Sequence, residues 1–252
     1  MMVAVRIACC LAVAPCLVLT GCLVSFEDYP VGPLGSGGAS ALATGGASSE
    51  AGGVSVANAG ASTLLIDDFE DGNSQVLLNA GRDGYWFTAN DGTGMQSPDP
   101  HADALPELLS PPRGMSTRAL HTSGSGFSVW GALVGANFVA VGMSAMPYSI
   151  SAYQGVTFTA KLGRVGVTAK ARLAITNYDT LYGCTTCDDH FGATVTFSDV
   201  FQTIQVPFAS LKQTGFGKPL LQTFATDRAY TLQFSWAKAE TFDVWIDDVS
   251  FY

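Results

Sequence analysis

The residues with the most obvious chemistry are the cysteines and the histidine of the run Cys184-Thr185-Thr186-Cys187-Asp188-Asp189-His190. A zinc site could use Cys184, Cys187 and His190, with Asp188 or Asp189 as the fourth ligand. A thioredoxin-like redox pair needs a strand-to-helix context, which the surrounding sequence lacks. A disulfide that closes a tight loop suits a chain that is exported to an oxidising compartment, which the N-terminal segment described below predicts. We therefore predict a Cys184–Cys187 disulfide that stiffens a loop between two strands, with zinc and redox chemistry as the alternatives.

The sequence carries no motif typical of a catalytic site. It has no nucleophile elbow, no His-Glu-x-x-His pair, no phosphate loop and no dinucleotide fingerprint. The three histidines, His101, His121 and His190, are scattered along the chain. A glycosidase needs two carboxyl groups across a cleft, but any acidic domain offers enough carboxylates for that. The sequence therefore favours a protein without catalytic activity and leaves an enzyme as the alternative.

The elements that must position these residues are β-strands. Apolar and polar residues alternate with a period of two in many short segments, and Gly, Asp, Asn, Ser and Pro separate the segments. Strands are expected at 64–69, 85–89, 119–122, 127–138, 156–162, 170–175, 193–197, 203–208, 230–236 and 242–251. The segment 95–113 is expected to be a long loop, and no long amphipathic helix is expected. The pattern predicts an all-β fold, a two-sheet antiparallel β-sandwich of jelly-roll type.

The first and last expected strands carry paired motifs. The first contains Ile66-Asp67-Asp68-Phe69-Glu70-Asp71-Gly72-Asn73, and the last contains Trp245-Ile246-Asp247-Asp248-Val249-Ser250-Phe251. With these motifs the segment 64–252 resembles the carbohydrate-binding jelly rolls of the galactose-binding-like superfamily. The resemblance is strongest to the family 11 type modules and to the related intermediate-associated-protein-30 fold. It bears on the fold more than on the ligand, because this fold hosts many functions.

The resemblance implies a structural Ca²⁺ ion where the two terminal strands meet. A hard cation takes six to eight oxygen ligands from carboxylates and carbonyls, and antiparallel pairing of these strands would bring such groups together. The expected ligands are Asp68, Glu70 and Asp247, with Asp67 and Asp248 as substitutes. The alternative is that these acidic residues stay in water at strand ends and discourage edge pairing.

The resemblance also implies a carbohydrate site, which needs flat aromatic faces and planar polar groups. Trp236 and Trp130 are expected in the core, because each lies in an apolar or in-phase run. Aromatic residues that flank the cysteine loop are better placed for binding. The expected carbohydrate-binding residues are Tyr178, Tyr182, His190, Arg172, Asp179 and Asp189.

The N-terminal segment is typical of export. Arg6 precedes an apolar run too short for a permanent membrane span, and Leu19-Thr20-Gly21-Cys22 resembles a bacterial lipobox. Cleavage would remove residues 1–21 as a lipoprotein signal peptide and leave Cys22 as the lipidated first residue. The alternative is an ordinary secretory signal. Residues 22–63 are rich in Gly, Ala and Ser and are predicted to form a disordered tether.

These observations lead to one favoured function. Residues 64–252 are expected to be a carbohydrate-binding-like domain on an exported lipoprotein of the outer membrane or cell surface, with a secreted or periplasmic protein as the alternative. The formal charge of −9 excludes the basic surface that nucleic acid requires. We expect a monomer that binds polysaccharide without catalysis. The alternatives are a polysaccharide hydrolase or lyase on the same scaffold, and a surface adhesion or assembly protein that binds other proteins.

Overall fold

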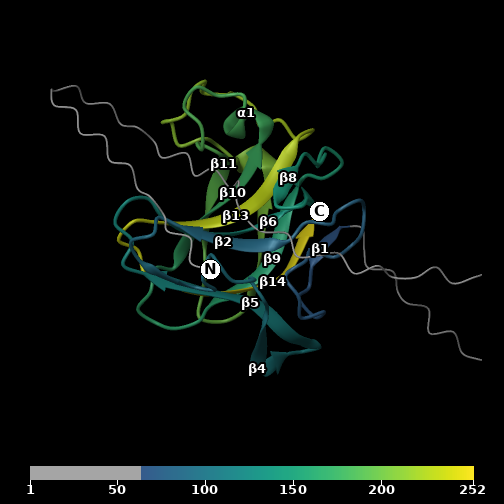
Figure 1. Cartoon of the computed structure of the whole chain (residues 1–252). Coiled ribbons are helices and arrows are strands. Elements are labelled where there is room, and N and C mark those ends of the chain that lie inside the picture. The colour runs from purple at the N-terminus through teal and green to yellow at the C-terminus, as the bar shows by residue number, and fades with distance from the viewer. Residues whose placement is uncertain (1–63) are drawn as a thin grey trace, which may run out of the picture. The chain divides into compact units, whose positions relative to one another are not determined.

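Alternating apolar and polar residues build two antiparallel sheets that face each other across one hydrophobic core (Figure 1). The computed structural model describes residues 64–252. The predictions for the signal peptide (1–21), the lipidated Cys22 and the tether (22–63) lie outside the described residues. The predicted all-β fold, a two-sheet antiparallel sandwich of jelly-roll type, is confirmed.

The larger sheet holds both terminal strands of the domain. Its main path runs β12 (Gln202–Pro207), β9 (Gly155–Leu162), β14 (Phe242–Phe251), β5 (Ser116–Ser125) and β3 (Met95–Ser97). β1 (Leu65–Asp67) pairs antiparallel with β14, and β4 (Glu107–Arg113) pairs with β5. The expected pairing of the first and last strands is confirmed. The expected loop at 95–113 is confirmed for 98–106 only, because β3 and β4 form at its two ends as short edge strands.

The second sheet has five strands. Its order is β11 (Phe191–Thr196), β10 (Lys170–Asn177), β13 (Ala229–Ala237), β6 (Gly131–Asn137) and β2 (Trp86–Asn90). β7 (Val139–Val141) and β8 (Ser144–Met146) form a separate hairpin. The helical elements described are α1 (Tyr178–Leu181) and a 3-10 turn at Phe208–Ser210. Within residues 64–252, no helix has the length and apolar character needed to cross a membrane.

The core joins the two sheets through aromatic contacts. The ring of Phe158 on β9 meets that of Phe234 on β13 edge to face, with ring centroids 4.9 Å apart. Trp236 on β13 stacks on Phe242 of β14 at 4.0 Å and is 2 % exposed, so its expected core position is confirmed. Because Phe234 and Trp236 point inward, the residues between and beside them on β13 point outward. The outer face of the five-stranded sheet is therefore the surface that the core does not use.

Candidate binding groove

A groove of about 940 Å³ lies on the outer face of the five-stranded sheet. Strand register places Thr194, Arg172, Ser235 and Leu133 in one row across β11, β10, β13 and β6. The neighbouring row, taken in the same strand order, is made of small or flexible residues: Gly192, Ala174, Gln233 and Gly135. Neither glycine leaves room for a side chain, because a Cβ on Gly135 would lie 2.8 Å from the Leu232 carbonyl oxygen and one on Gly192 would lie 2.5 Å from the Leu173 carbonyl oxygen.

Two exposed aromatic residues line the groove at its edges. Trp130 immediately precedes β6 and is 47 % exposed, and Phe216 lies in the segment between the 3-10 turn and β13 and is 57 % exposed. β6 and β11 are separated by β13 and β10, and residue Lys212 of the Phe216 segment bridges to β11. The two aromatic residues therefore flank the groove from different sides. The expected core position of Trp130 is wrong: it lies in the loop that precedes β6.

Arg172 and His190, two of the expected binding residues, line the groove and are held in place by the protein. The Arg172 guanidinium donates through Nη2 to the carbonyl oxygens of His190 at 3.0 Å and Lys212 at 2.5 Å. Burial lowers the pKa of Arg172, against the opposing charge of Asp189. The Nδ1 atom of His190 lies 2.9 Å from the hydroxyl of Thr180. Burial lowers the pKa of His190. Burial therefore disfavours the charged form of the imidazole at the groove wall.

Asp189 also lines the groove, but its carboxylate is turned toward the backbone of the Phe216 loop. It is buried, with 2 % of its surface exposed. Its neighbour Asp188 is exposed at the groove. The sequence predicted a binding role for Asp189, and the structure shows it supporting a loop that carries an exposed aromatic ring.

The remaining expected binding residues lie outside the groove, around α1. The ring of Tyr182 packs on Tyr230 with centroids 5.4 Å apart, and the guanidinium of Arg228 lies 4.4 Å from the ring centroid of Tyr178. A carboxylate oxygen of Asp179 lies 3.9 Å from Arg228. These residues form a small aromatic cluster of their own and do not line the groove.

The predicted disulfide is present between Cys184 and Cys187. Its loop is joined to the Phe216 segment by an antiparallel bridge between Thr186 and Lys218. The Lys218 amide donates to the Thr186 carbonyl at 2.9 Å, and the Thr185 amide donates to the Lys218 carbonyl at 2.9 Å. The disulfide therefore braces the loop that holds Phe216 at the groove.

Sequence reasoning missed Phe216 as a candidate. Phe216 stands between Gly215 and Gly217, and Gly215 has a positive φ of 113°. Glycines on both sides of an aromatic residue indicate a turn more than a regular buried strand. That local pattern was the signal available in the sequence.

Gln233 and Lys170, polar residues on the outward faces of β13 and β10, complete the groove.

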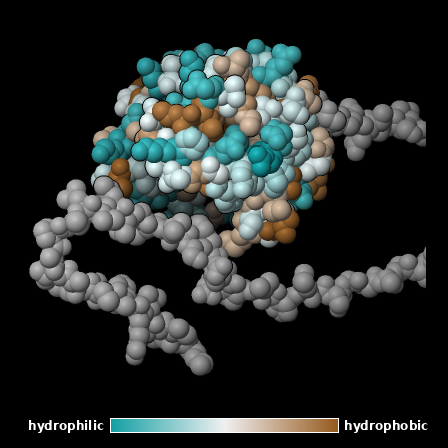
Figure 2. Space-filling model, turned by 90° about the horizontal axis from the view of Figure 1, so that it is seen from above, coloured by the Kyte–Doolittle hydropathy of each residue, from teal (hydrophilic) through white to brown (hydrophobic). Residues whose placement is uncertain are grey.

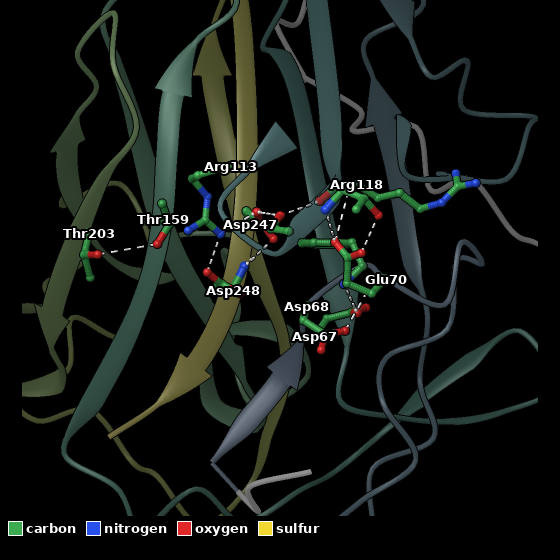
Figure 3. Close-up of polar contacts among 12 residues, drawn as sticks. Asp67, Asp68, Glu70, Arg113, Arg118, Thr159, Thr203, Asp247 and Asp248 are labelled. Carbon is green, nitrogen blue, oxygen red and sulfur yellow. Dashed lines mark hydrogen bonds and ion pairs between the residues drawn. The ribbon is translucent and has the colours of Figure 1, made fainter. Parts of the chain in front are cut away.

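The carboxylates expected to bind calcium are engaged by protein donors (Figure 3). Glu70 accepts hydrogen bonds from the Thr117 amide, the Thr117 hydroxyl and the Arg118 amide. Asp68 accepts one from the Glu70 amide at 3.3 Å. Asp247 is fully buried and lies 2.7 Å from the Arg113 guanidinium and 2.6 Å from the Ser116 hydroxyl.

This arrangement does not fit a shared calcium ion. Among residues 64–252, no three Asp, Glu, His or Cys side chains lie close enough together to hold a metal. The positive charge that a calcium ion would bring to these carboxylates is already supplied by a guanidinium, because Arg113 pairs with both Asp247 and Asp248. The Asp67 carboxylate is likewise bound, to the Phe69 amide and the Trp86 indole.

Carboxyl groups with raised pKa lie away from the groove. Burial raises the pKa of Asp67 to about 7, and burial also raises the pKa of Asp247. Both residues belong to the junction of β1 and β14, in the other sheet. The groove is also lined by the exposed carboxylate of Asp188 and by Glu240, which is half-buried.

Searches against protein-family models and curated proteins found no match. The chain is similar in fold to solved structures. One is the family 11 carbohydrate-binding module of the cellulase Lic26A-Cel5E of Clostridium thermocellum, at 15 % identity and a TM-score of 0.48, covering 74 % of this chain and 92 % of that one. Another is the family 30 module of Cel9D-Cel44B from the same organism, at 14 % and 0.47, covering 75 % and 96 %. At these identities the likeness concerns the fold.

Proposed function

We propose that residues 64–252 bind a neutral polysaccharide, without catalysis, in the groove on the outer face of the five-stranded sheet. The observation that carries the proposal is the pair of exposed aromatic side chains, Trp130 and Phe216, on either side of one groove. An aromatic face stacks against the apolar face of a sugar ring. Two aromatic rings on opposite sides of a groove can therefore each bind a different sugar of one chain.

The groove between the two rings offers hydrogen-bonding groups of the kind that sugar hydroxyls use. Gln233 and Ser235 on β13 supply an amide and a hydroxyl, and Lys170 on β10 supplies an ammonium group. The carboxylates of Asp188, which is exposed, and of Glu240, which is half-buried, lie in the same groove. Because positive charge does not prevail there and the whole chain is acidic, an anionic glycan would be repelled and a neutral one favoured.

The face shown in Figure 2 is less suited to a protein partner. On the face shown in Figure 2, hydrophobic residues form small patches that are separated by hydrophilic ones. Protein-binding surfaces usually present a larger continuous apolar patch. The carboxyl groups with raised pKa, which a glycosidase acid would need, lie in the other sheet. The position of these carboxyl groups, away from the groove, therefore favours binding over hydrolysis.

Affinity electrophoresis of the full chain in a neutral detergent tests the proposal. Native gels would contain neutral glucans, mannans or xylans, or an anionic polyuronate as the charged control. We expect one neutral class to retard the protein and the polyuronate to leave its mobility unchanged. Unchanged mobility in every gel would overturn the proposal, and loss of the embedded polymer along the lane would identify an enzyme instead.

We also propose that Cys22 carries a lipid that anchors the domain to a membrane surface. The support is the sequence from Arg6 to Cys22, which has the order of charged, apolar and small residues that a lipoprotein signal needs. Labelled palmitate should be incorporated into the chain in a bacterial host and not into C22A. Equal labelling of the two chains would refute the anchor.

A further inference from the structure

Asp91 holds the loop that presents Trp130. Its Oδ2 atom accepts hydrogen bonds from the backbone amides of Val129, Trp130 and Gly131, at 2.9, 2.9 and 3.0 Å. Its Oδ1 atom accepts from the amide and hydroxyl of Thr93, at 3.0 and 2.6 Å. Burial would raise the pKa of Asp91, but these hydrogen bonds outweigh it and hold the pKa below its usual range.

Asp189 holds the loop that presents Phe216 in the same manner. Its Oδ1 atom accepts from the amide and hydroxyl of Thr214, at 2.7 and 2.6 Å. Its Oδ2 atom accepts from the amides of Gly215 and Gly217, at 2.8 and 2.9 Å, so both neighbours of Phe216 are fixed. The fit is close, because a Cβ on Gly217 would lie 2.5 Å from the Asp189 Cβ. Burial opposes ionisation, but the hydrogen bonds lower the pKa of Asp189 to about 2.

The two carboxylates therefore play equivalent parts in different loops. Within residues 64–252 neither lies in a salt bridge, so backbone N–H groups provide most of the compensation for each negative charge. A loop whose amides are bound to a fixed charge is ordered before a ligand arrives. Binding to such a loop does not have to include the entropic cost of ordering it.

We propose that Asp91 and Asp189 are positioning residues that preorganise Trp130 and Phe216, respectively, as the two sugar-stacking faces of the groove. The proposal rests on the proposed function, because it assigns the aromatic rings a glycan to bind. Each carboxylate holds the loop of a different ring, so the effects of the two residues on Trp130 and on Phe216 are separable.

A double-mutant cycle on the full chain tests this separation. With the polysaccharide that retards the wild type, D91N should weaken binding about tenfold in the wild-type background and have little further effect in W130A. In F216A, D91N should still weaken binding about tenfold. D189N should show the reverse pattern, with its effect lost in F216A and kept in W130A. An equal loss in all backgrounds would mean a general effect on folding and would overturn the proposal.

A measurement without ligand separates this proposal from the proposed function. The full chain labelled with 5-fluorotryptophan gives a ¹⁹F resonance for Trp130, which W130F assigns by its disappearance. We expect D91N to shift or broaden that resonance and D189N to leave it unchanged. If D91N does not fold, T93V removes one donor to Asp91 and should give a smaller change of the same kind. An unchanged Trp130 resonance in a folded D91N or T93V chain would refute positioning, whether or not any glycan binds.

Discussion

The indole Nε1 of Trp86 donates a 2.7 Å hydrogen bond to the carboxylate of Asp67, and both side chains are almost completely removed from solvent. The other oxygen of Asp67 accepts from the Phe69 amide at 2.8 Å. Two N–H donors stabilise the ionised form, but burial is the larger effect and raises the pKa of Asp67 to about 7. A carboxyl group at the end of the first strand is therefore an internal titrating group.

This raised pKa predicts how stability depends on pH. The folded chain keeps a proton on Asp67 at pH values where the unfolded chain has lost it, so stability falls as pH rises from about 4 to 7. The shift corresponds to about 4 kcal/mol in the free energy of unfolding. D67N should lack this loss, as measured by urea unfolding at pH 4, 6 and 8. Asp199 is exposed, so D199N is the control and should lose stability with rising pH as the wild type does. If D67N lost as much stability as the wild type over this pH range, the assignment to Asp67 would be contradicted.

Arg113 supplies the positive charge at the junction of the terminal strands. R113A would leave the buried carboxylate of Asp247 without its cationic partner, 2.7 Å away in the wild type. We expect a loss of about 3 kcal/mol in the free energy of unfolding, typical of breaking a buried ion pair. R164A is the matched control: Arg164 is mostly exposed and lies 3.4 Å from Asp243, so its loss should matter little. Equal effects of the two substitutions would contradict this view.

Whether calcium binds at the same junction can be tested by melting the protein in Ca²⁺ and in EDTA. Because Glu70 and Asp247 are bound to protein donors, we expect the Tm to be the same in both solutions. A Tm that falls in EDTA would show that the carboxylates rearrange around an ion, as the family resemblance implies.

The sequence was a good guide to strands and a poor guide to loops. Alternation predicted β9, β10, β13 and β14 because one face of each strand is buried, and burial imposes a period of two. The edge strand β4 was missed because its two prolines and weak alternation resemble a loop. Trp130 and Phe216 escaped because a loop side chain's direction depends on tertiary contacts. Asp91 and Asp189 provide those contacts from distant parts of the sequence.

The disulfide should matter more for binding than for stability. It closes a ring between residues only three apart, so the entropic model gives about 2 kcal/mol at most. Its loop is nonetheless joined to the Phe216 segment through Thr186 and Lys218. We expect C184S/C187S to unfold at a slightly lower Tm and to bind the retarding polysaccharide several-fold more weakly. A large fall in Tm with unchanged binding would contradict this role.

The two exposed rings should carry a large part of the affinity. W130A and F216A each remove an aromatic face from the groove while leaving the core intact, so we expect each to weaken binding about tenfold with little change in Tm. The matched control is W245A. Trp245 stacks on His121 at 4.2 Å in the other sheet, outside the groove, so its removal should leave gel retardation unchanged. If W245A weakened binding as much as W130A did, the glycan would bind to the seven-stranded sheet, and the groove would have to be abandoned as the site.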